Sequence, residues 1–168
     1  MKTFKKILKE YLGYVLVIIA ILLVKSFVIS PIIVSGDSMD STLKDGDVML
    51  LNKLSYRTSE IERFDIVVIE YNDSFIIKRI IGMPGDTVKC IDNVLYINDK
   101  IYVENYLDDG TLTTDFEVDT IPDGYYFALG DNREVSLDSR KIGLIKEKDI
   151  EGQATFTIFP FNRFGSKK

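Results

Sequence analysis

Residues 65–81 read DIVVIEYNDSFIIKRII, and this stretch decides the fold class of the 168-residue chain. Two runs rich in β-branched and aromatic residues, Asp65–Tyr71 and Phe75–Ile81, lie on either side of Asn72-Asp73-Ser74. Strand-forming residues interrupted by turn residues in this way are typical of a β-hairpin. The stretch therefore predicts two paired antiparallel strands.

The rest of the chain beyond residue 30 also has the character of a β-protein. Short strand patterns bounded by turn residues cover 32–34, 48–54, 87–91, 94–98, 100–103, 124–129 and 152–159. The acidic residues 104–123 have little pattern and are predicted to form an exposed loop. No long 3.6-residue period follows residue 30. We therefore predict a mainly β fold, with short strands arranged in a barrel or sandwich.

The N-terminal region has a different composition. Residues 1–10 hold four Lys against one Glu, and residues 11–30 are almost entirely apolar. A helix over Tyr11–Ile29 would be about 28 Å long, close to the hydrocarbon thickness of a bilayer. Pro31 is expected to end this helix. We interpret 1–10 as a cytoplasmic head, 11–30 as a retained single-pass membrane anchor and 31–168 as an extracytoplasmic β-domain.

Two other interpretations of residues 11–30 stay open at this point. A cleaved signal peptide also has a basic start and an apolar centre, although no convincing small-x-small cleavage site follows here. A buried core helix is the other alternative, although the segment has no polar face.

The residue inventory excludes several function classes. The chain contains no His, which rules out a Ser-His-Asp triad, an HExxH zinc protease and the usual His-bearing zinc sites. No metal or cofactor is predicted. A net charge of −5 gives no indication of nucleic-acid binding. The single Cys, Cys90, can form no internal disulfide and is expected to be a buried core residue.

A hydrolase built from this chain needs Lys, a carboxylate or the N-terminal amine as its base, and SGDSM at 35–39 supplies a candidate nucleophile. Ser38 requires such a base because its hydroxyl is a poor nucleophile. Gly36 has no Cβ, so the backbone can approach a substrate closely. By itself the motif also fits an ordinary turn, in which Ser38 has no chemical role.

Lys78 is the candidate base. Strand alternation puts Lys78 on one face with Ile76 and Ile80, whereas Arg79 lies on the other face. Burial among Ile side chains lowers the pKa of a Lys, and a neutral amine can take a proton from Ser. We expect either Lys78 or Arg79 to point inward. An edge-strand Lys that only discourages aggregation is the alternative.

The third candidate region is the loop GDNREVSLDSR at 130–140, which contains Arg, acidic and Ser side chains in close succession. Side chains that can hydrogen-bond to one another at this density favour a structured polar network over a solvated loop. Such a network can hold Lys78 in position.

At this point several motifs resemble one family, the bacterial type I signal peptidases, particularly the short single-anchor forms of Gram-positive bacteria. The motifs are SGDSM with Ser41-Thr42-Leu43, then GDVMLLNK, KRIIGMPGD, GDNREVSLDSR and FPFNRFG. They follow the N-terminal apolar segment in the order typical of the family, and together they extend over nearly the whole chain.

The resemblance implies an all-β catalytic domain outside the membrane and a serine endopeptidase that removes signal peptides from secreted preproteins. It implies that Ser38 is the nucleophile and Lys78 the general base. Ser136 matches a Ser that hydrogen-bonds the Lys amine, and Asp138 and Arg140 match a structural ion pair. The implied supporting residues are completed by Gly36, Met39 near the membrane-facing substrate side, and Arg79. The implied partners are the lipid bilayer and signal peptides with small residues at the first and third positions before the cut.

The chain departs from the family pattern at a few positions. Ser41 stands where Pro is usual, and Phe64 stands where Gly usually precedes the strand that begins at Asp65. Gly36 occupies a place where some members carry a hydroxyl for the oxyanion hole. We therefore expect the Ser38 N–H to form most of this hole, with Ser35 as an additional donor.

Two alternative functions differ in class from signal peptide removal. A related Ser/Lys processing peptidase would act on another substrate, and a non-catalytic anchored β-domain would only bind. In the second case Ser38→Ala would change no cleavage reaction.

Overall fold

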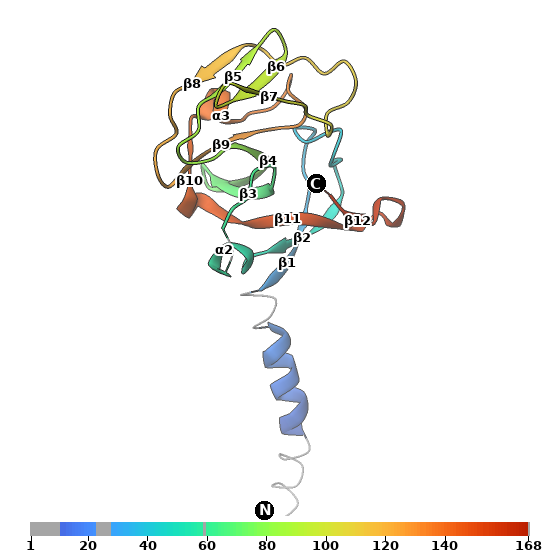
Figure 1. Cartoon of the computed structure of the whole chain (residues 1–168). Helices are drawn as coiled ribbons and strands as arrows, with labels where there is room; N and C mark the ends of the chain where they lie inside the picture. The colour runs from blue at the N-terminus through green and yellow to red at the C-terminus, as the bar shows by residue number, and fades with distance from the viewer. Residues whose placement is uncertain (1–10, 23–27, 59, 168) are drawn as a thin grey trace, which may run out of the picture.

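The structure, a computed structural model, describes residues 11–22, 28–58 and 60–167. Within the described part, residues 11–22 are helical and their side chains are exposed, and this helix stands apart from the β-domain (Figure 1). Among the helices in those ranges, none combines the length and the apolar character needed to cross a membrane. The predicted basic head and residues 23–27 of the predicted anchor lie outside the described residues.

The predicted end of the N-terminal helix at Pro31 is wrong. Strand β1 (Ile29–Ile33) already includes Ile29 and Pro31, and it pairs antiparallel with β2 (Val48–Asn52). Pro31 is tolerated because β1 lies at the edge of the sheet, where its missing N–H breaks no ladder. The apolar run of the sequence thus continues into the β-domain, which begins at least two residues earlier than predicted.

The larger sheet is antiparallel, with the strand order β1-β2-β11-β3-β4-β9-β10, and β12 is paired to β11. Its further strands are β3 (Ile66–Tyr71), β4 (Ser74–Gly82), β9 (Tyr125–Leu129), β10 (Ile145–Lys146), β11 (Ile150–Phe159) and β12 (Gly165–Ser166). The mainly β prediction is confirmed.

The predicted hairpin is confirmed as β3 and β4, which pair from Ile66 opposite Arg79 to Tyr71 opposite Ser74. Asn72 and Asp73 between them have positive φ values of 49° and 58°. Two consecutive residues in this region form the turn that matches strand twist, and Asn and Asp tolerate it well.

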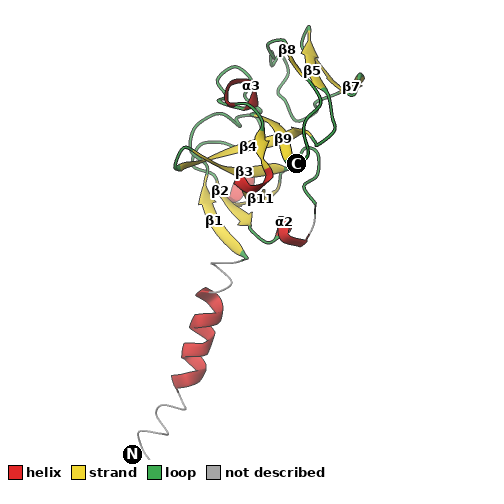
Figure 2. Ribbon diagram, turned by 90° about the vertical axis from the view of Figure 1, so that its left-hand side faces the viewer, coloured by secondary structure: helices red, strands yellow, loops and turns green. Residues whose placement is uncertain are grey.

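A second, smaller sheet has the order β7-β6-β5-β8 and lies at the far end of the domain from the N-terminal helix (Figures 1 and 2). Its strands are β5 (Val88–Ile91), β6 (Val94–Ile97), β7 (Lys100–Tyr102) and β8 (Phe116–Val118). The prediction of a loop throughout 104–123 is wrong, because β8 pairs with β5. Three residues are too few to show alternation, so only the tertiary pairing reveals this strand. Cys90 is buried on β5, as expected.

Short helical turns connect the strands: α2 (Ser55–Thr58), α3 (Ser139–Ile142), η1 (Glu147–Asp149) and η2 (Phe161–Arg163). Each is at most one turn long, so the sequence carried no periodic signal for it.

Separate core clusters support the two sheets. One contains Met39, Leu43 and Met49 and lies beneath the turn that follows β1. Another joins the sheets through Ile81, Val88 and Phe127 with their neighbours. At this junction Gly82 has a required role, since a Cβ there would collide with Val88 and Ile121. The sheets are therefore closely packed where β4 ends.

Candidate active site

Ser38 lies on a tight turn that leaves β1. Amide groups of Thr42 and Leu43 donate to the Met39 carbonyl, and the Met39 and Leu43 side chains are buried in the core. From the opposite side, the Asn132 N–H donates to the Ser38 carbonyl at 3.1 Å. Ser38 is thus a half-buried side chain on a backbone that is fixed on both sides.

Gly36 is required at its position by conformation. Its φ is +84°, in the region that favours glycine, and a Cβ there would meet no other atom. The open space is consistent with the close backbone approach that the sequence suggested. Its N–H donates to Asp45 Oδ1 at 2.8 Å, so this group already has an acceptor.

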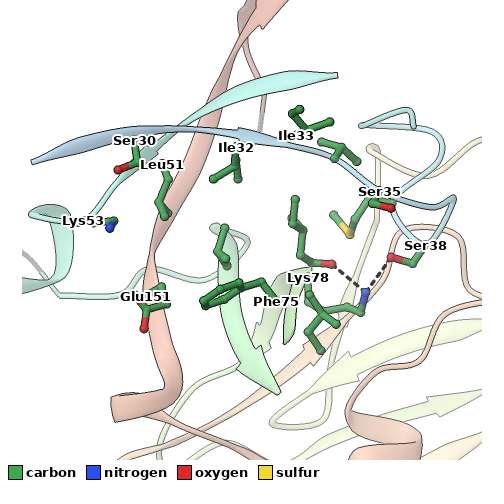
Figure 3. Close-up of a pocket in the computed structure, with 15 residues that line it drawn as sticks. Ser30, Ile32, Ile33, Ser35, Ser38, Leu51, Lys53, Phe75, Lys78 and Glu151 are labelled. Carbon is green, nitrogen blue, oxygen red and sulfur yellow. Dashed lines mark hydrogen bonds between the residues drawn. The ribbon is translucent and has the colours of Figure 1, made fainter. Parts of the chain in front are cut away.

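Lys78 projects from β4 toward the Ser38 turn. Its Nζ donates to Ser38 Oγ at 2.7 Å and to the Ile77 carbonyl at 2.8 Å (Figure 3). The residue is only 2 % exposed. The two side chains that the sequence singled out, forty positions apart, are therefore joined by a direct hydrogen bond.

Burial lowers the pKa of Lys78 from 10.5 to about 8, although the carboxylates of Asp138 and Asp131 oppose this change. Desolvation disfavours the ammonium form, whereas negative charges favour it. A substantial fraction of the amine is consequently neutral slightly above neutral pH, and the Ser38 hydroxyl is its neighbour.

Arg79 is buried as well, so the expectation that either Lys78 or Arg79 points inward was too narrow. The guanidinium donates to Asp131 Oδ1 and Oδ2 at 2.9 and 2.6 Å and to the Phe64 carbonyl at 3.0 Å. The Tyr106 ring lies 4.0 Å from the guanidinium carbon. Both faces of β4 are covered at this point, which alternation alone does not reveal.

The loop at 130–140 is a structured network. Asp138 accepts from Arg140 Nε at 2.9 Å, from Arg140 Nη2 at 2.8 Å and from the Gly130 N–H at 3.1 Å. Burial alone would raise the pKa of Asp138, but these hydrogen bonds outweigh it and the pKa is lowered. The Asp138–Arg140 pair thus remains charged and fixes the loop beside Lys78.

Ser136 differs from the expectation. Its hydroxyl is buried and has no hydrogen-bond partner among the described residues, so the expected bond to Lys78 is not formed. It lies beside the Asp138 carboxylate, and its hydroxyl helps to lower the pKa of Asp138. The hydroxyl instead faces Gly130, where a Cβ would collide with it and with the Ser38 carbonyl.

A groove of about 410 Å³ runs between β1 and the first half of β4 and reaches Ser38 and Lys78 at one end (Figure 3). Its wall is mainly apolar and includes Ile32, Val34 and Met39. Met39 is therefore both a core residue and part of the groove. A second hollow, lined by Asp37, Asp40, Asn132, Val135 and Leu137 among others, also reaches Ser38 and Lys78.

The sequence analysis missed two members of this site. Asp131 holds Arg79, and Thr42 Oγ1 donates to Asp131 Oδ2 at 2.5 Å, which connects the Ser38 turn to the Arg79 pair. Both residues belong to motifs that were identified, SGDSM with its extension and GDNREVSLDSR. Residue type alone did not distinguish them from ordinary loop residues.

Fold and site together define the class: a β-domain with a Ser side chain, a buried Lys and a strand-sized groove belongs with the serine peptidases. The family model described as signal peptidase, peptidase S26, matches residues 8–159.

Relatives with known names agree. Signal peptidase I of Bacillus licheniformis is 40% identical over 160 residues, covering 88% of this chain and 86% of that protein. Signal peptidase I T of Bacillus subtilis is 40% identical and covers 99% of this chain and 95% of that protein. The crystal structure of a signal peptidase I from Enterococcus faecalis matches with a TM-score of 0.52 at 36% identity, over 56% of this chain and 97% of that one. The chain therefore belongs to the signal peptidase family, peptidase S26.

Proposed function

We propose that the protein is a membrane-bound signal peptidase that uses Ser38 as nucleophile and Lys78 as general base to remove signal peptides from secreted preproteins. The observation that carries the proposal is the hydrogen bond between Lys78 Nζ and Ser38 Oγ, made by an amine whose pKa is lowered by burial. In a chain without His, Lys78 is the amine that lies within hydrogen-bond distance of the candidate nucleophile.

The reaction begins when neutral Lys78 takes the Ser38 proton while Ser38 Oγ attacks the scissile carbonyl. The resulting ammonium returns this proton to the leaving amine, the peptide C–N bond breaks and an acyl ester remains on Ser38. Lys78 then takes a proton from water while the water oxygen attacks the ester carbonyl. The bond between the acyl carbon and Ser38 Oγ breaks, the proton returns to Ser38 Oγ, and the acid product leaves. Lys78 Nζ thus carries the proton in both halves of the reaction.

The developing oxyanion requires an N–H donor at the nucleophile. The Ser38 N–H makes no hydrogen bond to another residue in the described part of the chain. The Gly36 N–H is bonded to Asp45. We therefore assign the oxyanion to the Ser38 N–H, with the Ser35 hydroxyl, which lines the groove, as the second donor.

The substrate binds as an added strand in the groove. β1 is an edge strand, and β4 pairs with β9 only over Arg79–Gly82, so residues 74–78 also present a free edge to the groove. Backbone hydrogen bonds to such edges hold an extended peptide, and pockets beneath select its side chains. The shallow apolar wall near Val34 and Met39 suits small residues at the first and third positions before the cut.

The membrane topology belongs to the same proposal. Residues 11–30 anchor the protein, residues 1–10 stay in the cytoplasm, and the β-domain lies outside. In support, the described helical residues 11–22 expose apolar side chains all round, including Leu16, Ile18 and Leu22. Such a surface is suited to lipid and not to water.

The test is cleavage of a preprotein with an Ala-x-Ala site by the full-length protein in vesicles, compared with Ser38→Ala, Lys78→Ala and Lys78→Arg. Wild type is expected to cut after the second Ala, and all three variants are expected to be inactive. Arg cannot act as a neutral base, so it matches Lys in charge but not in chemistry. Near-normal turnover by Lys78→Arg would contradict the mechanism.

A further inference from the structure

The groove has a second end that the proposed chemistry does not use. Ser30, Lys53 and Glu151 line it there, on the side of β1 away from Ser38 (Figure 3). Lys53 and Glu151 also border a neighbouring hollow together with Tyr56, Ile61, Glu147, Lys148 and Ile150. An otherwise apolar groove thus ends between two opposite charges.

Backbone contacts hold the two chain positions that carry these charges. Lys53 directly follows β2, and its N–H donates to the Val28 carbonyl at 2.9 Å. Glu151 lies on β11, next to Gly152, where a Cβ would collide with the Asn52 backbone. β2 and β11 therefore approach closely at this point. Lys53, just after β2, and Glu151, on β11, both line this end of the groove.

Neither charge is neutralised locally. Both residues are half-buried, and neither forms an ion pair with a residue in the described ranges. Half-buried charges on a groove act on a bound peptide more strongly than exposed ones, because they are less screened. These two charges would not strengthen the binding of an apolar peptide segment. They are suited to a bound peptide that carries a polar side chain at this end of the groove.

We propose that Lys53 and Glu151 form a charged subsite that recognises a polar side chain of the signal peptide, several residues before the cut. This inference rests on the proposed function. A substrate strand alongside β1 rises about 3.3 Å per residue, so the distance from Val34 back to Ser30 corresponds to about four residues. With the small residues bound near Ser38, the side chain at the subsite is about the fifth or sixth before the cut.

The direction of the substrate follows from the same geometry. β1 begins at the end of the β-domain that faces the N-terminal helix (Figure 1), and the chain after β1 leads to Ser38 at the other end of the groove (Figure 3). A signal peptide whose apolar part lies in the bilayer enters from the helix side, and its segment nearest the membrane passes the two charges first. A neutral polar side chain can contact both groups, whereas an acidic or basic one is attracted by one and repelled by the other.

The test reverses one charge at a time in the full-length protein. Preproteins carry Asp, Lys or Gln at single positions from the fourth to the seventh before the cut, and kcat/KM is measured for each. Glu151→Lys is expected to raise the Asp-to-Lys preference about tenfold at one or two adjacent positions, and Lys53→Glu to lower it about tenfold there. Added salt is expected to reduce both effects. Lys148→Glu changes the charge of the neighbouring hollow only and is the matched control.

Several results would overturn the proposal. One is an unchanged Asp-to-Lys preference in both reversal variants while wild type cleaves normally. A second is an equal change at every substrate position, or the same change in Lys148→Glu, because general electrostatics would then explain it. If a reversal variant fails to fold, Lys53→Gln and Glu151→Gln test the same preference with half the change in charge. Failure of wild type to cleave any preprotein would instead contradict the proposed function itself.

Discussion

Lys78 is the residue on which the proposed chemistry depends, and its protonation state follows from where it lies. The side chain is buried, and its amine contacts Ser38 Oγ. The two carboxylates that raise its pKa belong to Asp138 and Asp131, which are already paired with Arg140 and Arg79. The competition between desolvation and these carboxylates decides at which pH the amine is neutral.

The first prediction concerns the pH dependence of cleavage. Because only the neutral amine can accept the Ser38 proton, kcat/KM should rise with pH and level off above a pKa of about 8. Rates measured with one preprotein from about pH 6 to about pH 10 would reveal this limb. A profile that is flat through this range, or a limb near the ordinary Lys value, would contradict the assigned base.

The second prediction concerns stability. Lowering the pKa of Lys78 from 10.5 to about 8 destabilises the fold by roughly 3 kcal/mol at low pH, since a tenfold change in a protonation equilibrium is worth about 1.4 kcal/mol. The unfavourable term is complete below the folded pKa, shrinks as pH rises toward the unfolded value, and vanishes above it.

Lys78→Met should therefore be inactive and yet more stable than wild type near neutral pH, with a gain that disappears toward pH 10.5. Denaturant unfolding at several pH values measures this difference. Lys146→Met, at an exposed position on β10, is the control and should show no such trend. A Lys78→Met variant that is less stable at every pH would show that the hydrogen bond to Ser38 outweighs desolvation.

At this scale the sequence allowed a correct pairing of residues but not their full surroundings. The absence of His and the apolar strand around Lys78 made Ser38 and Lys78 candidates, and the family resemblance paired them before they were seen in contact. Ser136 could not be oriented, because the direction of a loop side chain depends on the turn that carries it. The burial of Arg79 likewise depends on Asp131, which lies fifty-two positions away.

At the scale of elements, the join between the two sheets depends on Phe64. This residue precedes β3 with a φ of +71°, an unusual conformation for a bulky side chain. Its ring contacts Tyr102 and Tyr106, with centroids 6.1 and 5.8 Å away, and its carbonyl accepts from Arg79. Aromatic contacts with the smaller sheet region thus accompany a backbone conformation that is strained for a bulky residue.

The third prediction separates these two contributions. Phe64→Ala loses the ring contacts and keeps the strain, whereas Phe64→Gly loses the same contacts and relieves the strain. Both variants should be less stable than wild type, and Phe64→Gly should exceed Phe64→Ala in stability by about 1 kcal/mol. Urea unfolding measures both differences. Equal stability of the two variants would mean that the backbone at this position carries no strain.

The elements themselves were predicted with uneven success, for physical reasons. The β3–β4 hairpin has long apolar runs and a turn of Asn and Asp, so local sequence determines it. β8 has three residues and forms only because β5 offers an edge, and the helical turns depend on the loops around them. Pro31 was taken as a helix end although an edge strand accommodates it equally well.

For the whole molecule, the C-terminal segment closes the fold over the Ser38 turn. Arg163 donates to Asp47 through Nε at 3.0 Å and through Nη2 at 2.9 Å, and to the Thr42 carbonyl at 3.0 Å. Asp47 is 2 % exposed. Residues more than a hundred positions apart thus support the backbone that carries Ser38.

The fourth prediction is that Arg163→Gln destabilises the protein by about 3 kcal/mol, because it leaves a buried carboxylate without its charged partner. Arg163→Gln combined with Asp47→Asn should recover part of this loss. Thermal or denaturant unfolding of the two single variants and the double variant gives the coupling between the residues. Additive losses would indicate that the pair contributes nothing to the closure.

At the scale of the whole molecule, the sequence predicted the features that follow a change in composition. It did not predict the contacts between segments that are distant in the chain. The break between an apolar N-terminal stretch and a β-domain is visible in the sequence. No local sequence pattern indicates the contacts of Arg163, the groove between β1 and β4 or the packing of the smaller sheet. These features arise from tertiary contacts.

The solitary thiol described on β5 has a practical consequence. Because Cys90 is the only Cys of the chain, is buried and has its pKa raised mainly by that burial, a thiol-specific reagent can reach it only when the smaller sheet opens. The wild-type enzyme therefore contains a natural probe for opening of the smaller sheet. Labelling rates of Cys90 in the presence and absence of a bound preprotein would measure how often the smaller sheet opens, without an engineered probe.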